Sequence, residues 1–418
     1  MNFIDDFISR GYYAQASNLD DLRELMSSKK IVAYIGFDAT ATSLHVGSLM
    51  QIMILRLLQK HGHKPIVIIG GATSKIGDPT GKDTARPSLT QEDINRNTQG
   101  IRQSLEKFLT FGDKPQDALL LDNSQWLDSI GYLNFLRNYG SLISINRMLT
   151  MESVKSRLDR EQSMSFLEFN YMLLQAYDFY HLAKEYNCVL QIGGSDQWGN
   201  ILMGMEFTRR ILSKEVFALT TPLLTTSSGV KMGKTVGGAT WLNQELTSAY
   251  DYYQYWRNCE DADVVRFSKL YCDFNKEEQS AFEASVQSDI NDAKKTLAYR
   301  VTCLCHGLEQ ATTARETACM VFEKRGLDFN LPVTQVTLSQ IGKIDVCDAL
   351  LQLNAVDSKS DAKRLIKSGA VRLNDETLYN QEVLSENLFV HLNPEDGLKY
   401  LKITLGKKKN FLVKLCLK

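Results

Sequence analysis

The chain has 418 residues, of which 44% are hydrophobic and 23% charged, and its 26 Gly and 7 Pro are too few for a collagen-like or Pro/Gly-rich disordered protein. This length exceeds one ordinary core, so we expect several domains. The 48 basic and 49 acidic residues give a net charge of −1, which excludes a globally cationic coat for nucleic acid and requires any polyanion site to be local.

We expect a cytoplasmic protein without a membrane anchor. No apolar run approaches the roughly 18 residues that span a bilayer, and the first ten residues contain two acids and one Arg instead of an apolar signal core. The eight cysteines never form C-x-x-C, which favours buried thiols in a reducing compartment. Cys303, Cys305 and His306 lack the spacing of zinc ligands, so no structural metal is expected.

Short β-branched runs alternate with helical patterns over the first two hundred residues. This alternation predicts a parallel sheet with crossover helices, a doubly wound, Rossmann-like α/β domain over residues 1–225. We expect strands at residues 31–37, 66–69, 118–121 and 189–192. We expect helices at residues 46–60, 91–109 and 166–186.

Three further regions follow this domain. No proline interrupts the sequence between Pro222 and Pro332, and helical patterns dominate there, so residues 226–326 predict an α-helical domain. Residues 327–344 have few charges and no sustained periodicity, which is typical of a linker. Residues 345–418 predict a small α+β domain.

The first segment that indicates chemistry is YIGFDATATSLHVGS, residues 34–48, between a predicted buried strand and an amphipathic helix. Backbone N–H groups and the dipole at a helix start favour phosphate oxygens, and a glycine there lets a nucleotide approach the backbone. The imidazole of His45 can donate to the same anion. Taken alone, His-x-Gly-Ser is also a pattern of ordinary loops.

A second segment, GVKMGKT at residues 229–235, places two lysines around a glycine. Both can reach a triphosphate and neutralise the charge that grows as pyrophosphate leaves. A P-loop needs four residues between its first glycine and Gly-Lys-Thr, whereas Gly229 leaves three, which disfavours a P-loop NTPase. A solvated turn is the alternative for this loop alone.

A third segment, VLQIGGSDQWGN at residues 189–200, again runs from a strand through a glycine turn to a helix. Ligands of open α/β sheets bind at such strand ends, where a carboxylate can accept from ribose hydroxyls. In the predicted helix at residues 166–186, Tyr171, Gln175 and Asp178 share one face. This polar row indicates a binding surface, and a wet aromatic face is the alternative.

Residues 357–374 (DSKSDAKRLIKSGAVRLN) predict a basic helix followed by a glycine turn and a strand. Its basic side chains, together with the lysines at 407–409, can contact the phosphates of RNA. A solvated charged face is the alternative for such a run.

Together these segments resemble one enzyme family. His45-Val-Gly47-Ser48 resembles the HIGH signature of class I aminoacyl-tRNA synthetases, and residues 231–235 resemble their KMSKS loop. Residues 357–374 resemble the S-four-type RNA-binding domain that ends the bacterial-type tyrosyl-tRNA synthetases. The same enzymes carry segments similar to residues 34–38, 171–178 and 193–200, so the resemblance covers nearly the whole chain.

The resemblance implies that the chain activates L-tyrosine with ATP and Mg²⁺ and transfers it to tRNA(Tyr) as a homodimer. The implied catalytic residues are Thr40, His45, Lys231 and Lys234. Tyrosine would be bound by Tyr34, Asp78, Tyr171, Gln175, Asp178, Gln191 and Gln197. ATP would be bound by Gly36, Asp38, Gly47, Ser48, Gly193, Asp196 and Lys234. The tRNA would be contacted by Asn123, Trp126, Lys363, Arg364 and Lys367.

The sequence departs from the family signatures at two places. Ser48 replaces the second histidine of HIGH, and Gly233 and Thr235 replace the two serines of KMSKS. The alternatives are a tryptophanyl enzyme, whose family lacks the terminal RNA module and the Tyr/Asp hydroxyl pair, and a catalytically silent RNA-binding relative. Adenylation itself needs no general base, because the substrate carboxylate is ionised at pH 7.

Overall fold

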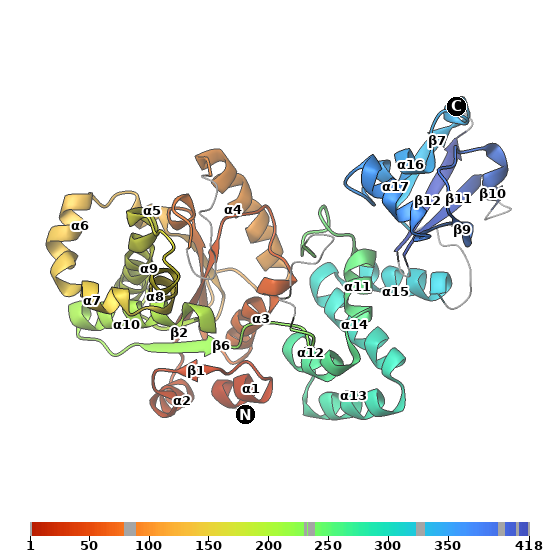
Figure 1. Cartoon of the computed structure of the whole chain (residues 1–418). Coiled ribbons are helices and arrows are strands. Elements are labelled where there is room, and N and C mark those ends of the chain that lie inside the picture. Colours follow the sequence, from red (N-terminus) through yellow and green to blue (C-terminus); the bar gives the residue numbers. More distant parts are fainter. Residues whose placement is uncertain are drawn as a thin grey trace. The chain divides into compact units, whose positions relative to one another are not determined.

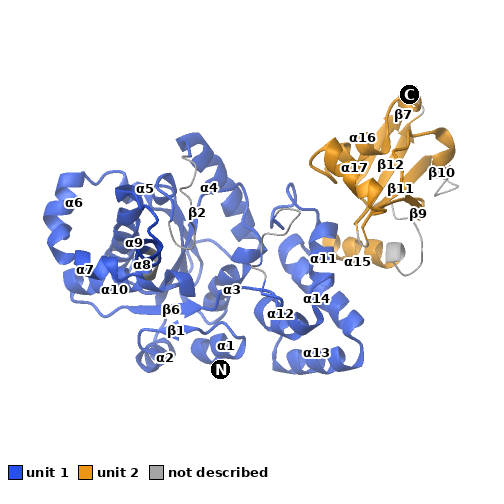
Figure 2. Ribbon diagram, viewed as in Figure 1, with its two compact units in different colours: residues 1–308 blue, residues 309–418 orange. Residues whose placement is uncertain are grey.

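The computed structural model describes residues 2–78, 89–229, 232, 239–322, 331–391, 398–406 and 409–416. The chain divides into two compact units, Met1–Leu308 and Glu309–Lys418 (Figure 2), and each contains its own sheet. Within the described part of the chain, no helix combines the length and the apolar composition that crossing a membrane requires.

The first unit contains a six-stranded sheet. Its strands are β1 Gln15–Ala16, β2 Val32–Asp38, β3 Lys64–Gly70, β4 Leu119–Asp122, β5 Cys188–Gly194 and β6 Phe217–Thr221. They lie in the order β1-β6-β5-β2-β3-β4, with β2 to β6 parallel and β1 antiparallel to β6. Figure 1 labels β1, β2 and β6 of this sheet. Each of the four predicted strands overlaps one of these, and the doubly wound α/β class is confirmed.

Helices connect these strands. They are α1 Phe3–Ser9, α2 Leu19–Ser28, α3 Val46–Lys60, α4 Gln91–Glu106, α5 Ser124–Leu127, α6 Tyr132–Tyr139, α7 Ile145–Leu149, α8 Glu152–Asp159, α9 Phe166–Glu185 and α10 Trp198–Leu212. The helix predicted at 46–60 has the bounds of α3, whereas those predicted at 91–109 and 166–186 end earlier. α9 begins at a capping box formed by Ser165 and Glu168, which satisfies two backbone N–H groups at its start.

Side chains are buried on both faces of this sheet. Tyr34 of β2 and Ile66 of β3 pack with Phe179 of α9 in one apolar cluster. Since side chains alternate along a strand, the neighbouring Ile35 and Val67 point to the opposite face, where they are buried as well. Burial on both faces explains why β2 and β3 read as continuous apolar runs instead of alternating ones.

The strand order changes direction between β2 and β5. From β2 the chain passes through α3 to β3 and then to β4 on one side, whereas β5 and β6 lie on the other side of β2. The carboxyl ends of two parallel strands that diverge in this way flank a crevice, which is where open α/β sheets bind ligands. The ends of β2 and β5 carry two of the segments that the sequence indicated.

A helical region completes the first unit, with α11 Ala249–Arg257, α12 Val264–Tyr271, α13 Lys276–Ser288 and α14 Ile290–His306. Arg10 donates to the carbonyl oxygens of Cys272 at 3.0 Å and Phe274 at 3.3 Å, beyond the end of α12. Arg56 of α3 forms an ion pair of 2.8 Å with Asp273. These bonds join the helical region to the sheet domain, so the boundary predicted at residue 225 falls inside one compact unit.

The second unit combines α15 Leu308–Phe322, α16 Val346–Gln352 and α17 Lys359–Lys367 with a second sheet. The strands of this sheet are β7 Val333–Thr337, β8 Val371–Leu373, β9 Glu376–Leu378, β10 Val390–His391, β11 Lys399–Leu405 and β12 Lys409–Cys416. They lie in the order β7-β12-β11-β8-β9, and β10 pairs with β11. The core is apolar, with Leu350, Ile366, Leu401 and Val413 among its members.

The linker predicted at residues 327–344 is wrong in part, because this range contains a strand of the second sheet. β7 lies within that range and pairs in parallel with β12, from Val333 opposite Leu412 to Thr337 opposite Cys416. Val336 is fully buried in the core of the second unit. The segment is too short for its alternation of β-branched residues to stand out, and its partner strand lies about 80 residues later, so local patterns did not indicate it.

Candidate active site

The loop between β2 and α3 brings a strand end and a helix start together. β2 ends at Asp38, Thr40 is exposed in the loop, and His45 is the N-cap of α3, with Ser48 in its first turn. Nδ1 of His45 accepts from the backbone N–H of Gly47 at 3.0 Å. A neutral imidazole whose Nδ1 accepts carries its proton on Nε2. His45 can therefore donate from Nε2 at the positive end of a helix, where anions are favoured.

Gly47 is the point at which the lysine-bearing loop meets α3. A Cβ at this position would lie 2.7 Å from Cε1 of His45 and 2.9 Å from the carbonyl oxygen of Met232, so no larger residue fits without a shift. Met232 is buried and lies between the two predicted lysines in the sequence. Its backbone is thus in contact with the start of the helix. Lys231 and Lys234 themselves lie outside the described residues.

A buried carboxylate lies deeper in the first unit, on α9. Asp178 is 4% exposed, and its two oxygens accept from Nε1 of Trp126 at 2.7 Å and from Nδ2 of Asn123 at 3.0 Å. Burial raises the pKa of Asp178 to about 7, against the lowering effect of these two donors and with a smaller raising effect from Asp122. Both carboxylate oxygens are thus oriented by donors fixed in the interior.

Tyr34 faces the same region from β2, where it is in register with Gln191 of β5. Its ring lies 5.4 Å from that of Phe179, the neighbour of Asp178 in the sequence. Burial first, and then the charge of Asp178, raise the pKa of Tyr34 well above its usual value, so the hydroxyl keeps its proton. Among the described residues, neither this hydroxyl nor Oε1 of Gln191 has a hydrogen-bond partner, which is uncommon for buried polar atoms.

The predicted tRNA contacts of Asn123 and Trp126 are corrected. Asn123 is 1% exposed and Trp126 is 6% exposed, and each donates to Asp178 inside the unit. Asn123 also accepts from the N–H of Ala72 at 2.9 Å and donates to Oγ1 of Thr73 at 3.0 Å. Such buried side chains offer no surface to a tRNA. The short motif around them did not reveal this, because their partner lies more than 50 residues later.

A second polar cluster surrounds the other end of the predicted helix face. The hydroxyl of Tyr171 donates to Oδ1 of Asp38 at 3.4 Å, and Nε2 of Gln197 donates to Oδ2 of Asp78 at 2.8 Å. Nε2 of Gln175 lies 3.5 Å from Oε1 of Gln197. Two carboxylates and an amide oxygen thus lie close together as hydrogen-bond acceptors. An ammonium group, which has three donors and no acceptor, fits such a cluster.

The end of β5 lies on the other side of the switch in strand order from β3. A Cβ at Gly193 would lie 3.0 Å from Cδ1 of Ile201, and a Cβ at Gly194 would lie 2.4 Å from Oδ1 of Asp196, so a side chain at either position would require these neighbouring side chains to move. Asp196 and Gly36 are exposed on either side of the strand switch. The crevice therefore offers one accessible carboxylate and bare backbone to a ligand.

Comparisons with known proteins agree with this geometry. A family model described as "tRNA synthetases class I (W and Y)" matches residues 26–323. The chain is 57% identical over 417 residues to the Tyrosine--tRNA ligase of Rickettsia bellii (strain RML369-C), covering 99% of this chain and 100% of that one. The chain belongs to the class I tyrosyl-tRNA synthetases. The protein of the same name from Rickettsia conorii (strain ATCC VR-613 / Malish 7) is 58% identical with the same coverage.

A solved structure of this family has the same fold. The crystal structure of a C-terminally truncated Aspergillus nidulans mitochondrial tyrosyl-tRNA synthetase matches with a TM-score of 0.70 at 30% identity, over 77% of this chain and 94% of that chain. The family resemblance inferred from the HIGH-like and KMSKS-like segments is thereby confirmed. The Rickettsia relatives extend the similarity through the second unit.

The basic helix of this synthetase is α17 in the second unit. Lys363, Arg364 and Lys367 are exposed, and Arg364 forms an ion pair with Asp361 one turn earlier. Ala362 and Ile366 on the other face are buried in the core. The helix is thus amphipathic, and its packing presents the three cations to solvent.

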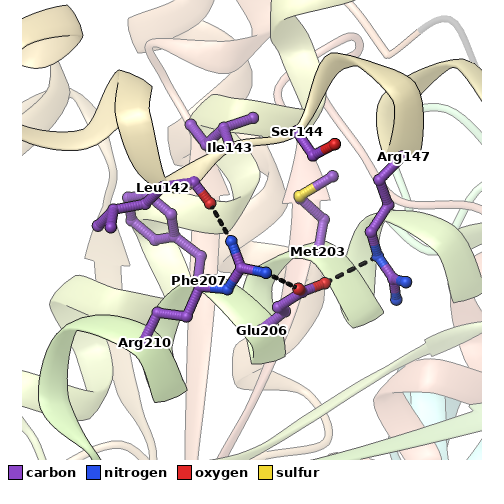
Figure 3. A pocket seen from close by; sticks show the side chains of 8 residues that line it. All are labelled: Leu142, Ile143, Ser144, Arg147, Met203, Glu206, Phe207 and Arg210. Atoms are coloured by element: carbon purple, nitrogen blue, oxygen red, sulfur yellow. Dashed lines mark hydrogen bonds and ion pairs between the residues drawn. The ribbon is translucent and has the colours of Figure 1, made fainter.

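A small pocket lies away from the crevice, between the segment at 142–147 and α10 (Figure 3). Glu206 forms ion pairs of 2.7 Å with Arg147 and 2.6 Å with Arg210, which also donates to the carbonyl oxygen of Leu142 at 2.6 Å. Its volume of about 10 Å³ leaves room for a water molecule and not for a substrate. Within the described residues, no group of His, Cys, Asp or Glu side chains could hold a metal ion.

The motifs did not indicate Trp241, which also reaches the site. Its ring centroid lies 5.9 Å from that of His45, and the two residues form an antiparallel bridge. Trp241 comes shortly after the lysine-bearing loop in the sequence, and this proximity was the available signal. The separation of almost 200 residues hid the pairing from local patterns.

Proposed function

We propose that this chain ligates tyrosine to tRNA(Tyr) in two steps. The tyrosine carboxylate attacks the α-phosphorus of ATP, which forms tyrosyl-adenylate and releases pyrophosphate. A terminal ribose hydroxyl of the tRNA then attacks the tyrosyl carbonyl and releases AMP. The observation that carries the proposal is the buried Asp178 carboxylate, oriented by Asn123 and Trp126 in the same region as Tyr34.

The proposed tyrosine pocket would bind both polar ends of the substrate, the phenol and the ammonium group. The substrate phenol would donate to Asp178 and accept from Tyr34, whose hydroxyl has no partner among the described residues. The ammonium group would be bound by the acceptor-rich cluster of Asp78, Tyr171 and Gln175, with Gln191 and Gln197 lining the pocket. A site that hydrogen-bonds the substrate hydroxyl leaves buried groups unpaired when phenylalanine enters, so phenylalanine is rejected. This enzyme family is the known example of such selectivity.

The phosphate side stabilises the leaving pyrophosphate. His45 would donate from Nε2, and Thr40 from its exposed hydroxyl, to oxygens of the triphosphate. Lys231 and Lys234 would neutralise the growing charge, and ATP enters together with Mg²⁺ as the substrate. The remaining ATP contacts, on both sides of the crevice, are Gly36, Asp38, Gly47, Ser48, Gly193 and Asp196. Positioning and charge stabilisation are sufficient here, because the attacking carboxylate is already ionised.

The second unit would contact the tRNA through Lys363, Arg364 and Lys367, whose exposed cations suit a phosphate backbone.

We place the enzyme in the cytoplasm as a homodimer. The exposed apolar side chains of α6 to α9 suit a subunit interface, because such patches are rare on monomers; they include Leu133 at 79%, Phe166 at 68%, Ile145 at 64% and Tyr132 at 55% exposure. Sedimentation of the protein and of a Leu133→Asp variant tests the dimer.

The first experiment is ATP–pyrophosphate exchange with purified protein, Mg²⁺ and tyrosine, phenylalanine or tryptophan, without tRNA. We expect exchange with tyrosine alone. Exchange with tryptophan would favour a tryptophanyl enzyme, and exchange with none of the three would favour a silent RNA-binding relative. Charging of tRNA(Tyr) in a second assay tests the transfer step separately.

A further inference from the structure

The segment that follows the lysine-bearing loop is fixed to the segment that ends in His45. The N–H of Val46 donates to the carbonyl oxygen of Thr240 at 3.0 Å, and the N–H of Leu242 donates to that of Leu44 at 2.8 Å. These two bonds flank the bridge between His45 and Trp241. The downstream end of the lysine-bearing loop is therefore in backbone contact with the start of α3.

Asn243 ends this segment in the interior, with 4% exposure. Its Nδ2 donates to the carbonyl oxygens of Gly100 at 2.8 Å and Thr42 at 3.2 Å. Its Oδ1 lies 2.9 Å from Oγ of Ser104, and its backbone N–H donates to Oγ of Ser43 at 3.1 Å. One side chain thus bonds the loop before His45 and helix α4 at the same time.

Helix α4 packs directly against this junction. Ser104 is fully buried, and its Oγ also accepts from the N–H of Leu44 at 3.1 Å. A Cβ at Gly100 would lie 1.9 Å from the carbonyl oxygen of Thr42, so the helix and the loop touch backbone to backbone. The close approach leaves the loop little freedom relative to α4.

The opposite end of the lysine-bearing loop has separate anchors. The N–H of Ser227 donates to Asp263 at 2.9 Å, and the hydroxyl of Ser228 donates to Glu260 at 2.6 Å. These acids lie between α11 and α12, whereas Asn243 connects to α4 and the loop before His45. The two ends of the loop are thus held by different parts of the unit.

We propose that Asn243 is a positioning residue for adenylation, which sets the separation between His45 and the lysine-bearing loop. The inference rests on the proposed roles of His45, Lys231 and Lys234 at the triphosphate. Asn243 touches no substrate in this scheme. It holds the segment before His45 and residues 240–242 against one helix, which fixes the position of the His45 donor relative to the point where the loop returns.

The test is Asn243→Ala, assayed for exchange kinetics, for tyrosine affinity by equilibrium dialysis, and for Tm. A misplaced phosphate site lowers kcat, and we expect a loss of about 10- to 100-fold, with the tyrosine Kd unchanged within about twofold because the tyrosine pocket is built on other elements. Asn275→Ala is the matched control, since it removes an asparagine N-cap from α13 and costs stability without touching this junction.

Two outcomes would overturn the proposal. Asn243→Ala could lower Tm like Asn275→Ala and leave kcat intact, or it could weaken tyrosine binding as much as it lowers kcat. If Asn243→Ala does not fold, Ser104→Ala serves as the second variant, because it retains both donations from Nδ2 of Asn243. We expect Ser104→Ala to lower kcat by a smaller factor. A wild-type kcat in Ser104→Ala would contradict the positioning role of Asn243. Wild-type protein without any exchange would refute the proposed function instead, so the two failures are distinguishable.

Discussion

The two sides of the crevice are built differently. On the proposed tyrosine side, Tyr34, Asp178 and Gln191 are buried. Asp178 accepts from the buried Asn123 and Trp126, whereas the Tyr34 hydroxyl has no partner among the described residues. On the phosphate side, Thr40 and Asp196 are exposed, and the loop that carries the lysines reaches α3 through the backbone of Met232. The proposed function therefore assigns selectivity to buried groups and charge stabilisation to exposed ones.

This difference has a physical reason. A buried hydrogen-bond pair discriminates strongly because an unsatisfied partner costs its full desolvation energy, about 1–3 kcal/mol. A triphosphate is bulky and highly charged, and pyrophosphate has to leave after the reaction, so its donors are better placed where solvent can enter. Mutations on the two sides should therefore separate selectivity from rate.

The largest expected effect is on the phosphate side. His45→Ala removes a donor at the helix start and should lower kcat of tyrosine-dependent exchange by about 10²- to 10³-fold. The tyrosine Kd should change little, because His45 is not among the residues proposed to bind tyrosine. His61→Ala, at the other end of α3, is the matched control and should leave exchange unchanged. Equal losses of rate and tyrosine affinity would contradict the separation of the two sides.

On the tyrosine side, Asp178→Asn and Tyr34→Phe should lower selectivity for tyrosine over phenylalanine by about 10- to 100-fold, as expected for losing a hydrogen bond to a buried charged or polar group. The quantity to measure is the ratio of kcat/KM values in exchange. Activity with phenylalanine should persist, because the phosphate side is intact. Unchanged selectivity in both variants would remove these residues from the pocket.

The sequence predicted the sheet well because its determinants are local. Continuous apolar runs located β2 and β3, and helical periodicity gave the bounds of α3. Local patterns also found candidate residues at strand ends. Asp38 and Gly194 end parallel strands beside the switch in strand order. What periodicity could not give is the pairing of distant segments.

Three cases show this limit. Local patterns place β7 in a linker because its partner β12 lies far along the chain. The family resemblance assigned Trp126 to tRNA, and no local pattern revealed its bond to Asp178, which crosses 52 residues. Local patterns also miss Asn243, because its partners Thr42 and Gly100 lie 201 and 143 residues away. In each case the role follows from tertiary bonds that leave no short motif.

The second unit offers a third region for the comparison. Replacing Lys363, Arg364 and Lys367 together by alanine should weaken tRNA charging and lower its salt dependence, with the slope falling by about one for each phosphate that is no longer neutralised. Exchange without tRNA serves as the internal control and should be unchanged. Charging that keeps its salt slope would show that α17 does not contact the tRNA backbone.

The pH dependence of tyrosine binding sharpens the description of the buried side. Asp178 has a pKa of about 7, and a bound phenol that donates to the ionised form lowers this pKa. Tyrosine affinity should therefore fall as the pH drops through about 7. Trp126→Phe removes a donor to the carboxylate, which raises its pKa and moves the midpoint to higher pH.

Equilibrium dialysis with labelled tyrosine between about pH 5.5 and 8.5 measures this midpoint. Asp178→Asn is the control, since it has no carboxyl to titrate there and its affinity should be flat. A wild-type affinity that is equally flat would mean that Asp178 keeps one protonation state throughout, and the donor assigned to the phenol would have to be reconsidered.

The smallest effect is expected away from both sides, at Glu206. Glu206→Gln weakens the ion pairs with Arg147 and Arg210, two half-exposed side chains, so it should cost about 0–1 kcal/mol of stability and lower Tm by a few degrees at most. Exchange and selectivity should both be unchanged, as in a Glu106→Gln control that breaks the exposed pair with Arg102. Because α10 begins two residues after Asp196, a clear loss of kcat would show instead that this ionic cluster supports the rim of the crevice.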